Sequence, residues 1–235
     1  MKLCVCFGLT LLAAIWSAAA ASADDRRVVV DPNTPPWNAV AKVQTNIGTK
    51  CTGVLIGAAV VLTAAHCLYN PRTQAMLQPV SLHVLFGFER DTYRWHRLVA
   101  RFVIGRGFDP VWPRPQHWDW ARLELSEAVP EPPLPVASKQ PSGGMEVALA
   151  GYNQDRSELL MADLHCHLRD VVTVSDGSAM IEHDCGGTRG TSGGPLLARQ
   201  GGGGWVVVGI NIAAGPNDNI ALAPPLDELS DHPPH

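Results

Sequence analysis

Three short segments of the sequence carry residue types that act together in nucleophilic catalysis. The segment VLTAAHC contains His66, an imidazole followed at once by a cysteine. The segment DWARLEL opens with the carboxylate of Asp119 in front of an apolar run, and the segment GTSGGP holds Ser192 among glycines. A serine hydroxyl becomes a nucleophile when a histidine takes its proton and a carboxylate orients that histidine. Together the three segments predict an acyl-transfer site with His66, Asp119 and Ser192 as its catalytic triad.

The glycines around the serine predict a second catalytic feature. Glycine accepts strained backbone conformations that expose N–H groups, so the N–H groups of Gly190 and Ser192 are expected to form an oxyanion hole. Loss of one such donor costs about 2.7–4 kcal/mol of transition-state stabilisation. Each segment alone has an ordinary interpretation: a structural histidine, a turn aspartate ending the loop 110–117, or a common Gly-Ser turn. Only their combination is specific.

The first 23 residues have the pattern of an export signal. Lys2 precedes an apolar run, Leu3–Ile15, and the small residues ASA at 21–23 fit a cleavage site. A membrane anchor is the alternative, but the apolar run is shorter than the roughly 20 residues that a spanning helix needs. We therefore expect a mature chain that begins near Asp24, is secreted or periplasmic, and has no membrane attachment.

Four cysteines remain after the signal: Cys51, Cys67, Cys166 and Cys185. An oxidising compartment favours disulfides. Four cysteines allow three pairings, and proximity along the chain favours Cys51–Cys67 and Cys166–Cys185. The first bridge would fix the backbone that carries His66, which a general base requires.

Composition and spacing argue against two other kinds of site. The formal net charge is −4 and the basic residues are scattered, so no phosphate-binding face is expected and nucleic acid is excluded as a partner. The stretches HCH at 165–167 and HDC at 183–185 contain soft ligand types. They lack the paired spacing of zinc sites, and we expect neither a metal nor a cofactor.

The chain as a whole predicts an all-β fold. Its 235 residues include 22 glycines and 19 prolines between short apolar runs, which favours many short strands. The expected strands are 39–47, 51–56, 60–63, 80–88, 94–104 and 118–125, then 145–152, 165–174, 179–183, 195–198, 205–212 and 220–223. A helix is expected only around Leu226–Leu229. The proline-rich segment 127–144 cannot be a central strand or a helix interior. The expected organisation is a signal peptide 1–23, a strap or pro-segment 24–38, a first half 39–126, a linker 127–144, and a second half with a C-terminal tail 145–235.

The segments TAAHC, DWARL and TSGGP, in the order His, Asp, Ser, resemble the trypsin/chymotrypsin superfamily of serine peptidases. The resemblance covers most of residues 39–223, including the GYNQD stretch that opens the second half. The short spacing from Asp119 to Ser192, and His-Asp-Cys ahead of the serine segment, resemble the bacterial V8-like or glutamyl endopeptidase branch. The resemblance implies two six-stranded antiparallel β-barrels with the site in the crevice between them. It also implies a monomeric, secreted endopeptidase that cleaves protein or peptide substrates through an acyl-enzyme.

Two departures from that family concern activation. Animal trypsin-like enzymes have an aspartate before the serine that pairs with a newly cut N-terminus, whereas this chain has Thr191. Activation by that ion pair is therefore not expected. The dibasic Arg26-Arg27 resembles a processing site and fits a solvated pair of charges equally well.

The specificity pocket departs from both known patterns. The floor position of the trypsin pattern is Gly186, which carries no acid, although Asp184 is near if the loop shifts. Glutamate-preferring relatives have a histidine at the position of Asn211, and Arg189 fits either the pocket rim or a solvent-facing site. We assign Gly186, Arg189 and Asn211 to the pocket and leave the preference for the residue before the cut open.

Two rival interpretations remain. The sequence GTSGG also fits the nucleophile elbow G-x-S-x-G of α/β-hydrolases, which requires an acid and then a histidine downstream. The downstream candidates are Asp218, Asp227, His232 and His235, and the helices of that fold are not expected. The second rival is an inactive secreted homologue that binds a partner through the peptidase scaffold, and the complete triad argues against it.

Overall fold

The computed structural model of the chain describes residues 25–111, 115–214, 219–224 and 228–229. The strands are β1 (Arg27–Val29), β2 (Val40–Thr45), β3 (Lys50–Gly57), β4 (Val60–Thr63), β5 (Tyr69–Asn70), β6 (Ala75–Met76), β7 (Leu82–Phe86), β8 (Trp95–Ile104), β9 (Ala121–Leu125), β10 (Glu146–Gly151), β11 (Met161–Thr173), β12 (Ala179–His183), β13 (Pro195–Arg199), β14 (Trp205–Ala214) and β15 (Asn219–Ala223). The short 3₁₀ helices are η1 (Trp37–Ala39), η2 (Ala65–Leu68), η3 (Pro79–Ser81) and η4 (Gln154–Arg156).

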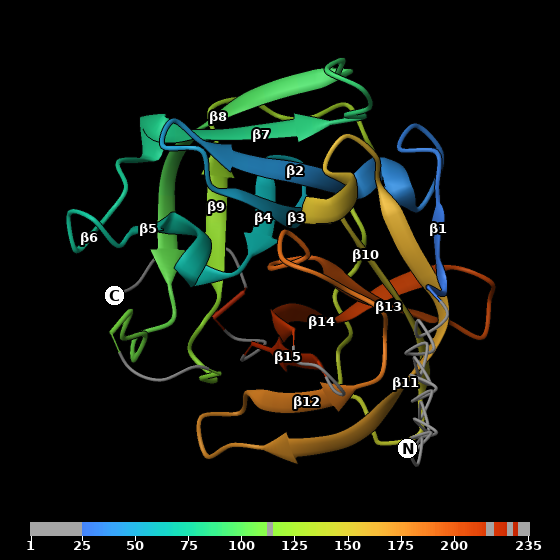
Figure 1. Cartoon of the computed structure of the whole chain (residues 1–235). Helices are drawn as coiled ribbons and strands as arrows, with labels where there is room; N and C mark the ends of the chain where they lie inside the picture. Colours follow the sequence, from blue (N-terminus) through green and yellow to red (C-terminus); the bar gives the residue numbers. More distant parts are fainter. Residues whose placement is uncertain (1–24, 112–114, 215–218, 225–227, 230–235) are drawn as a thin grey trace, which may run out of the picture.

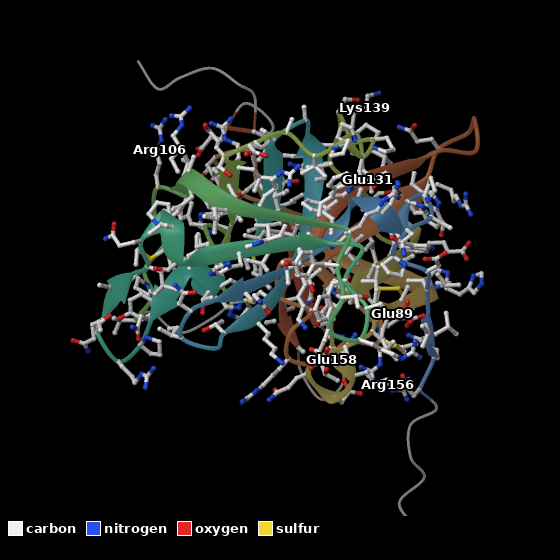
Figure 2. The ribbon with its side chains drawn as sticks, turned by 90° about the horizontal axis from the view of Figure 1, so that it is seen from above. Glu89, Arg106, Glu131, Lys139, Arg156 and Glu158 are labelled. Atoms are coloured by element: carbon white, nitrogen blue, oxygen red, sulfur yellow. A yellow bond between two sulfur atoms is a disulfide. The ribbon has the colours of Figure 1, made fainter. Side chains whose placement is uncertain are left out.

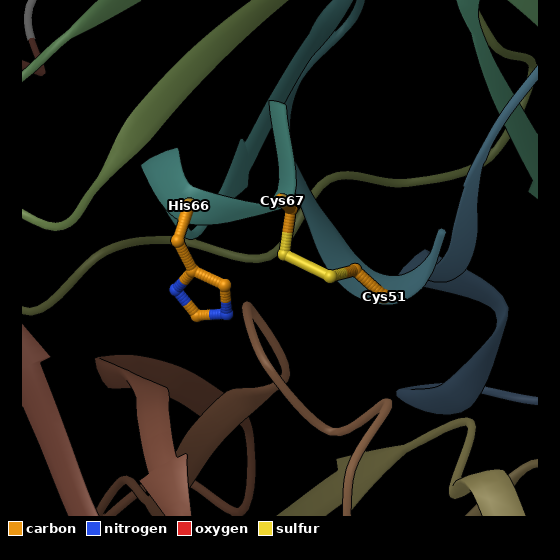
Figure 3. A group of neighbouring side chains, drawn as sticks. All are labelled: Cys51, His66 and Cys67. Carbon is orange, nitrogen blue, oxygen red and sulfur yellow. A yellow bond between two sulfur atoms is a disulfide. The ribbon is translucent and has the colours of Figure 1, made fainter. Parts of the chain in front are cut away.

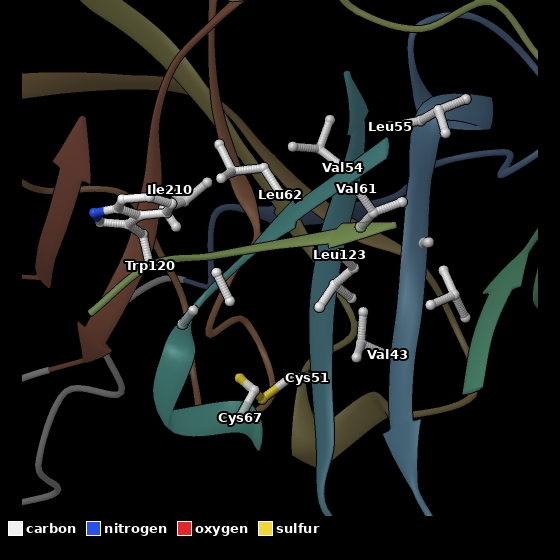
Figure 4. Close-up of a cluster of buried hydrophobic side chains, with 14 of the residues drawn as sticks. Val43, Cys51, Val54, Leu55, Val61, Leu62, Cys67, Trp120, Leu123 and Ile210 are labelled. Atoms are coloured by element: carbon white, nitrogen blue, oxygen red, sulfur yellow. A yellow bond between two sulfur atoms is a disulfide. The ribbon is translucent and has the colours of Figure 1, made fainter. Parts of the chain in front are cut away.

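The first barrel is formed by β2, β3, β4, β9, β8 and β7, which close on themselves in antiparallel order. Figure 1 shows it as the blue-to-green half of the molecule. Its strands are rich in Val and Leu, whose side chains pack well on a pleated surface. Val54, Leu62 and Leu123 are fully buried in its core (Figure 4).

The second barrel is formed by β10, β13, β14, β15 and β12, and it closes where β12 pairs with β11. The expected all-β fold with two six-stranded antiparallel barrels is therefore confirmed. The α/β-hydrolase interpretation is wrong, because the described residues form closed antiparallel barrels and contain no α-helix. Its candidate partners at 218, 227, 232 and 235 lie outside the described residues. So do two of the four residues of the helix expected at 226–229, and the other two, 228 and 229, form a turn.

The N-terminal segment contributes a strand that the sequence analysis did not predict. β1 pairs antiparallel with the first residues of β11, with Arg27 opposite Asp163 and Val29 opposite Met161. It lies along the outer edge of β11, opposite β10 (Figure 1). β11 accordingly begins at Met161 and not at the expected His165. Its first three residues, 161–163, pair with β1 on one side and with β10 on the other.

One hydrophobic core joins the two barrels. Trp120, the residue after the candidate aspartate, is buried in the same cluster as Ile210 of β14 (Figure 4). The linker 127–144 crosses both barrels: Leu134 N donates to Leu55 O, and Ala137 N donates to Val207 O. The two barrels are therefore held against each other by a shared core. In the described part of the chain, no helix is long and apolar enough to cross a membrane.

Candidate active site

The pairing of β4 with β9 brings His66 and Asp119 together. The two strands are antiparallel, with Thr63 opposite Ala121, so the end of β4 and the start of β9 meet at one edge of the barrel. His66 lies in η2, directly after β4, and Asp119 lies just before β9. Residues far apart in the sequence thus reach hydrogen-bond distance through a single strand pairing.

The aspartate holds the histidine by two hydrogen bonds. Asp119 is fully buried; its Oδ1 accepts the backbone N–H of His66 at 2.8 Å, and its Oδ2 lies 2.7 Å from His66 Nδ1. The carboxylate therefore fixes both the backbone and the ring of the histidine. A proton on Nδ1 leaves Nε2 free to act as a base.

A disulfide fixes the segment that carries His66. Cys67 is bonded to Cys51 of β3, and the second bridge joins Cys166 to Cys185. Figure 3 shows the His66 imidazole projecting from the short helical turn in which the next residue, Cys67, is bonded to Cys51. The two groups of neighbouring metal-ligand types in the described residues each contain one of these bridges. Their sulfurs are disulfide sulfurs and not the thiolates that bind metals.

The serine loop docks on the first barrel beside this histidine. Ser192 O accepts the N–H of Thr52 at 2.8 Å and lies 3.9 Å from Cys67 Sγ. A Cβ placed on Gly193, whose φ is +79°, would lie 2.2 Å from Thr52 O and 2.2 Å from Thr63 Oγ1. The serine loop thus approaches the first barrel so closely at position 193 that only glycine fits there. The structure also brings Ser192 next to Cys67, the residue that follows His66.

The backbone of the serine loop presents two free donors. Gly190 has a φ of +97°, and the preceding carbonyl, Arg189 O, accepts the N–H of Gln154 at 2.6 Å. In that peptide the Gly190 N–H points away from Gln154. Among the described residues, neither the N–H of Gly190 nor that of Ser192 donates to an acceptor. This is the state that an oxyanion hole requires, because its donors must be available to the substrate.

Thr52 connects the first barrel to this loop, and sequence reasoning missed it. Its buried hydroxyl donates to Gly190 O at 2.8 Å and accepts the N–H of Tyr152 at 2.9 Å. Its backbone N–H holds Ser192 O. One threonine therefore fixes the carbonyls of both residues whose N–H groups are free. Its only sequence signal is its position after Cys51.

We expect Thr52→Val to destabilise the protein and lower its activity together. The substitution keeps the shape but leaves two buried polar groups unpaired, at about 1–3 kcal/mol for such a group. Thermal unfolding and peptide hydrolysis would measure the two effects, and Thr52→Ser should restore most of both. The control is Thr45→Val, which removes a buried hydroxyl that accepts Thr49 N–H in the β2–β3 turn. Equal activities of the two valine variants would argue against a role for Thr52 in the site.

The three pocket candidates have different surroundings. Gly186 N donates to Asp163 Oδ2 at 2.7 Å, and a Cβ on Gly186 would point toward Arg27. Arg189 has an exposed side chain. Asn211 is buried, with its amide 3.3 Å from Thr191 Oγ1.

Two nearby residues bear on the same region. His183 is fully buried, with Nε2 3.1 Å from the Asn211 amide. Neither its sequence position nor its spacing indicated this contact. Asp184, considered as a shifted pocket floor, instead accepts the His167 N–H at 2.8 Å through Oδ1. Its carboxylate is engaged with β11.

Comparisons with known proteins identify the family and the fold. The family described as "Trypsin-like peptidase domain" matches residues 51–210. The chain therefore belongs to the trypsin-like peptidase family, and the predicted resemblance is confirmed. It is 40% identical over 107 residues to the glutamyl endopeptidase of Bacillus licheniformis, a match that spans 45% of this chain and 32% of that protein. The chain thus aligns with about a third of that relative's length.

The fold is also similar to a solved structure described as a Glu endopeptidase in complex with MPD. The TM-score is 0.69 and the identity 19%, over 86% of this chain and 92% of that one. At this identity the likeness supports the double-barrel fold alone.

Proposed function

We propose that this chain is an exported serine endopeptidase with His66, Asp119 and Ser192 as its triad. The observation that carries the proposal is the buried Asp119 bonded to His66 Nδ1 at 2.7 Å, beside a serine loop with unpaired Gly190 and Ser192 N–H groups. A general base, its orienting carboxylate, a nucleophile and an oxyanion hole are the parts that acyl transfer needs.

In the proposed mechanism, His66 Nε2 takes the proton of Ser192 Oγ as that oxygen attacks the scissile carbonyl. The negative charge that forms on the carbonyl oxygen is stabilised by the N–H groups of Gly190 and Ser192. His66 then gives its proton to the leaving amine, and the acyl-enzyme forms on Ser192. Water, activated by the same imidazole, hydrolyses this ester and restores the hydroxyl. Throughout, Asp119 stabilises the imidazolium and remains ionised.

The proposal includes export and a mature chain from Asp24 that acts as a monomer on proteins or peptides. Both disulfides suit an oxidising compartment. The relative's name, glutamyl endopeptidase, suggests cleavage after acidic residues, but Asn211 supplies an amide and no positive charge. Cleavage preference is therefore an outcome of the test below.

The test uses residues 24–235, produced with disulfides formed, and a mixed peptide library analysed by mass spectrometry. We expect cleavage by the unmodified chain and none by Ser192→Ala. The residue before each cut gives the specificity. A fluorophosphonate should form an adduct on Ser192 in the first protein and not in the second.

A folded chain that neither cleaves the library nor takes the label would contradict this proposal. The inactive homologue that binds a partner would then be the better interpretation. Circular dichroism and a count of free thiols on the same samples would show that the protein is folded and bridged. Cleavage by both proteins would point to a contaminating peptidase and leave the labelling result to decide.

A further inference from the structure

The N-terminal strand β1 carries two arginines that contact the loop leading to Ser192. β1 has only three residues, and Val28 and Val29 are 45% and 55% exposed. Burial of apolar side chains therefore contributes little to holding the strand in place. Its specific contacts come from the β11 ladder and from Arg26 and Arg27.

Arg27 makes the larger set of contacts. Its guanidinium donates to both carboxylate oxygens of Asp25, to both of Asp155, and to Asn153 Oδ1 at 2.6 Å. Its side chain is only 9% exposed. The expectation of a solvated pair of charges is therefore wrong for Arg27, because its donors are fully used inside the protein. Asn153 and Asp155 lie in the loop between β10 and β11. Arg156 and Glu158 of the same loop are labelled in Figure 2.

The groups that Arg27 binds also bind the serine loop. Asn153 Oδ1 accepts the N–H of Thr188 at 3.0 Å, and Asp155 Oδ1 accepts the Thr188 hydroxyl at 2.9 Å. Between them, Gln154 N donates to Arg189 O. That last bond fixes the peptide whose N–H belongs to Gly190. Arg27 thus reaches the oxyanion hole through one short segment, 153–155.

Arg26 holds the other end of the same loop. Its Nη2 lies 3.0 Å from Oδ2 of Asp163, a side chain that is 2% exposed. The same oxygen accepts Gly186 N–H at 2.7 Å, and Arg26 also donates to Asp184 O. A buried carboxylate is costly without a charged partner, so Arg26 stabilises the arrangement in which Asp163 holds Gly186.

We infer that Arg27, supported by Arg26, positions the oxyanion hole from the N-terminal strand, and that the active peptidase keeps this strand uncut. The inference rests on the proposed function. Thr191 occupies the place where animal relatives have an aspartate that pairs with a new N-terminus. Here two arginine side chains supply fixed positive charge behind the loop without proteolysis. The hydrogen bond from Arg27 holds the pKa of Asp155 at about 2, so this ion pair persists at ordinary pH. Cutting at the dibasic site would remove the contacts and the activity.

The kinetic test compares Arg27→Ala and Arg27→Lys with the unmodified chain from Asp24. Removal of an oxyanion donor costs 10²–10³-fold, so a displaced donor is expected to lower kcat at least about tenfold. KM should change less than about threefold, because ground-state binding does not use the oxyanion hole. Affinity for a peptide boronate should fall in parallel with kcat. Lysine lacks the planar fork that serves several acceptors, and its kcat should be intermediate.

Two further proteins complete the kinetic test. A chain that begins at Val28 should lose as much activity as Arg27→Ala. Arg101→Ala removes an ion pair with Glu124 on the first barrel, and its kcat should be unchanged. If Arg27→Ala and the shortened chain kept full kcat below their melting temperatures, the strand would be a structural element only and the inference would be overturned.

Hydrogen exchange separates this inference from the proposed function. Peptides covering 186–193 should exchange faster in Arg27→Ala than in the unmodified chain, while peptides of β2–β4 should not change. This readout needs no catalysis. If the unmodified chain neither cleaves nor labels, the proposed function fails. Hydrogen exchange alone then decides whether Arg27 holds the serine loop in place. Equal exchange of peptides 186–193 in Arg27→Ala and in the unmodified chain would overturn the inference, whether or not the protein is active.

Discussion

Asp119→Asn is expected to lower kcat about 10⁴-fold while the protein stays folded. The carboxylate now accepts from two donors, the His66 backbone N–H and His66 Nδ1. An asparagine can keep only the backbone bond through its oxygen, and its NH₂ then faces Nδ1. The imidazole must accept that bond at Nδ1 and carry its proton on Nε2. In this tautomer Nε2 cannot take the proton of Ser192.

The measurements are kcat on the best library peptide and the rate of fluorophosphonate labelling. Asp31→Asn is the matched control, because Asp31 is exposed and, among the residues that the structure describes, its carboxylate accepts only from nearby Asn33. Thermal unfolding of both variants shows whether the fold is intact. A loss below tenfold, in a folded Asp119→Asn protein, would mean that His66 is not the base or that Asp119 does not set its tautomer.

The sequence allowed the prediction of an all-β fold because most strands carry their own signal, and the resemblance to a known family added the arrangement as two barrels. Segments such as 60–63 and 179–183 were expected with the bounds that the structure has, since apolar runs between turn residues define them locally. The proposed triad followed from three motifs in a fixed order. Neither prediction needed knowledge of long-range contacts.

The residues that hold the site could not be predicted in this way. Thr52, Asn153 and Asp163 act through contacts with loops distant in the sequence, and their types are common on any surface. Arg27 was ambiguous for the same reason: its meaning depends on a strand of three residues that pairs with β11. Such a strand has too few residues for a periodic pattern. The contacts of Gly186 with Asp163 and Arg27 could not be predicted either, because they too depend on the placement of the N-terminal strand.

Gly190→Ala is expected to lower kcat about 10²–10³-fold although the N–H donor remains. Gly190 has φ +97°, and its Cβ would lie 2.3 Å from Tyr152 O and 3.2 Å from Gln154 N. Both are backbone atoms, so the clash cannot be relieved by turning a side chain. The loop must move, and with it the peptide held by the Gln154–Arg189 bond. Affinity for a peptide boronate should fall with kcat, while KM changes little.

Gly203→Ala separates strain from the clash. Gly203 has φ +89° in the turn between β13 and β14, and a Cβ there would meet nothing within 4 Å. Both alanines carry the left-handed backbone cost of roughly 1–2 kcal/mol, so both proteins should melt earlier. Only Gly190→Ala should lose catalysis. If the two variants had equal kcat, the Gly190 N–H would not be an oxyanion donor, and the hole would have to be sought elsewhere in the serine loop.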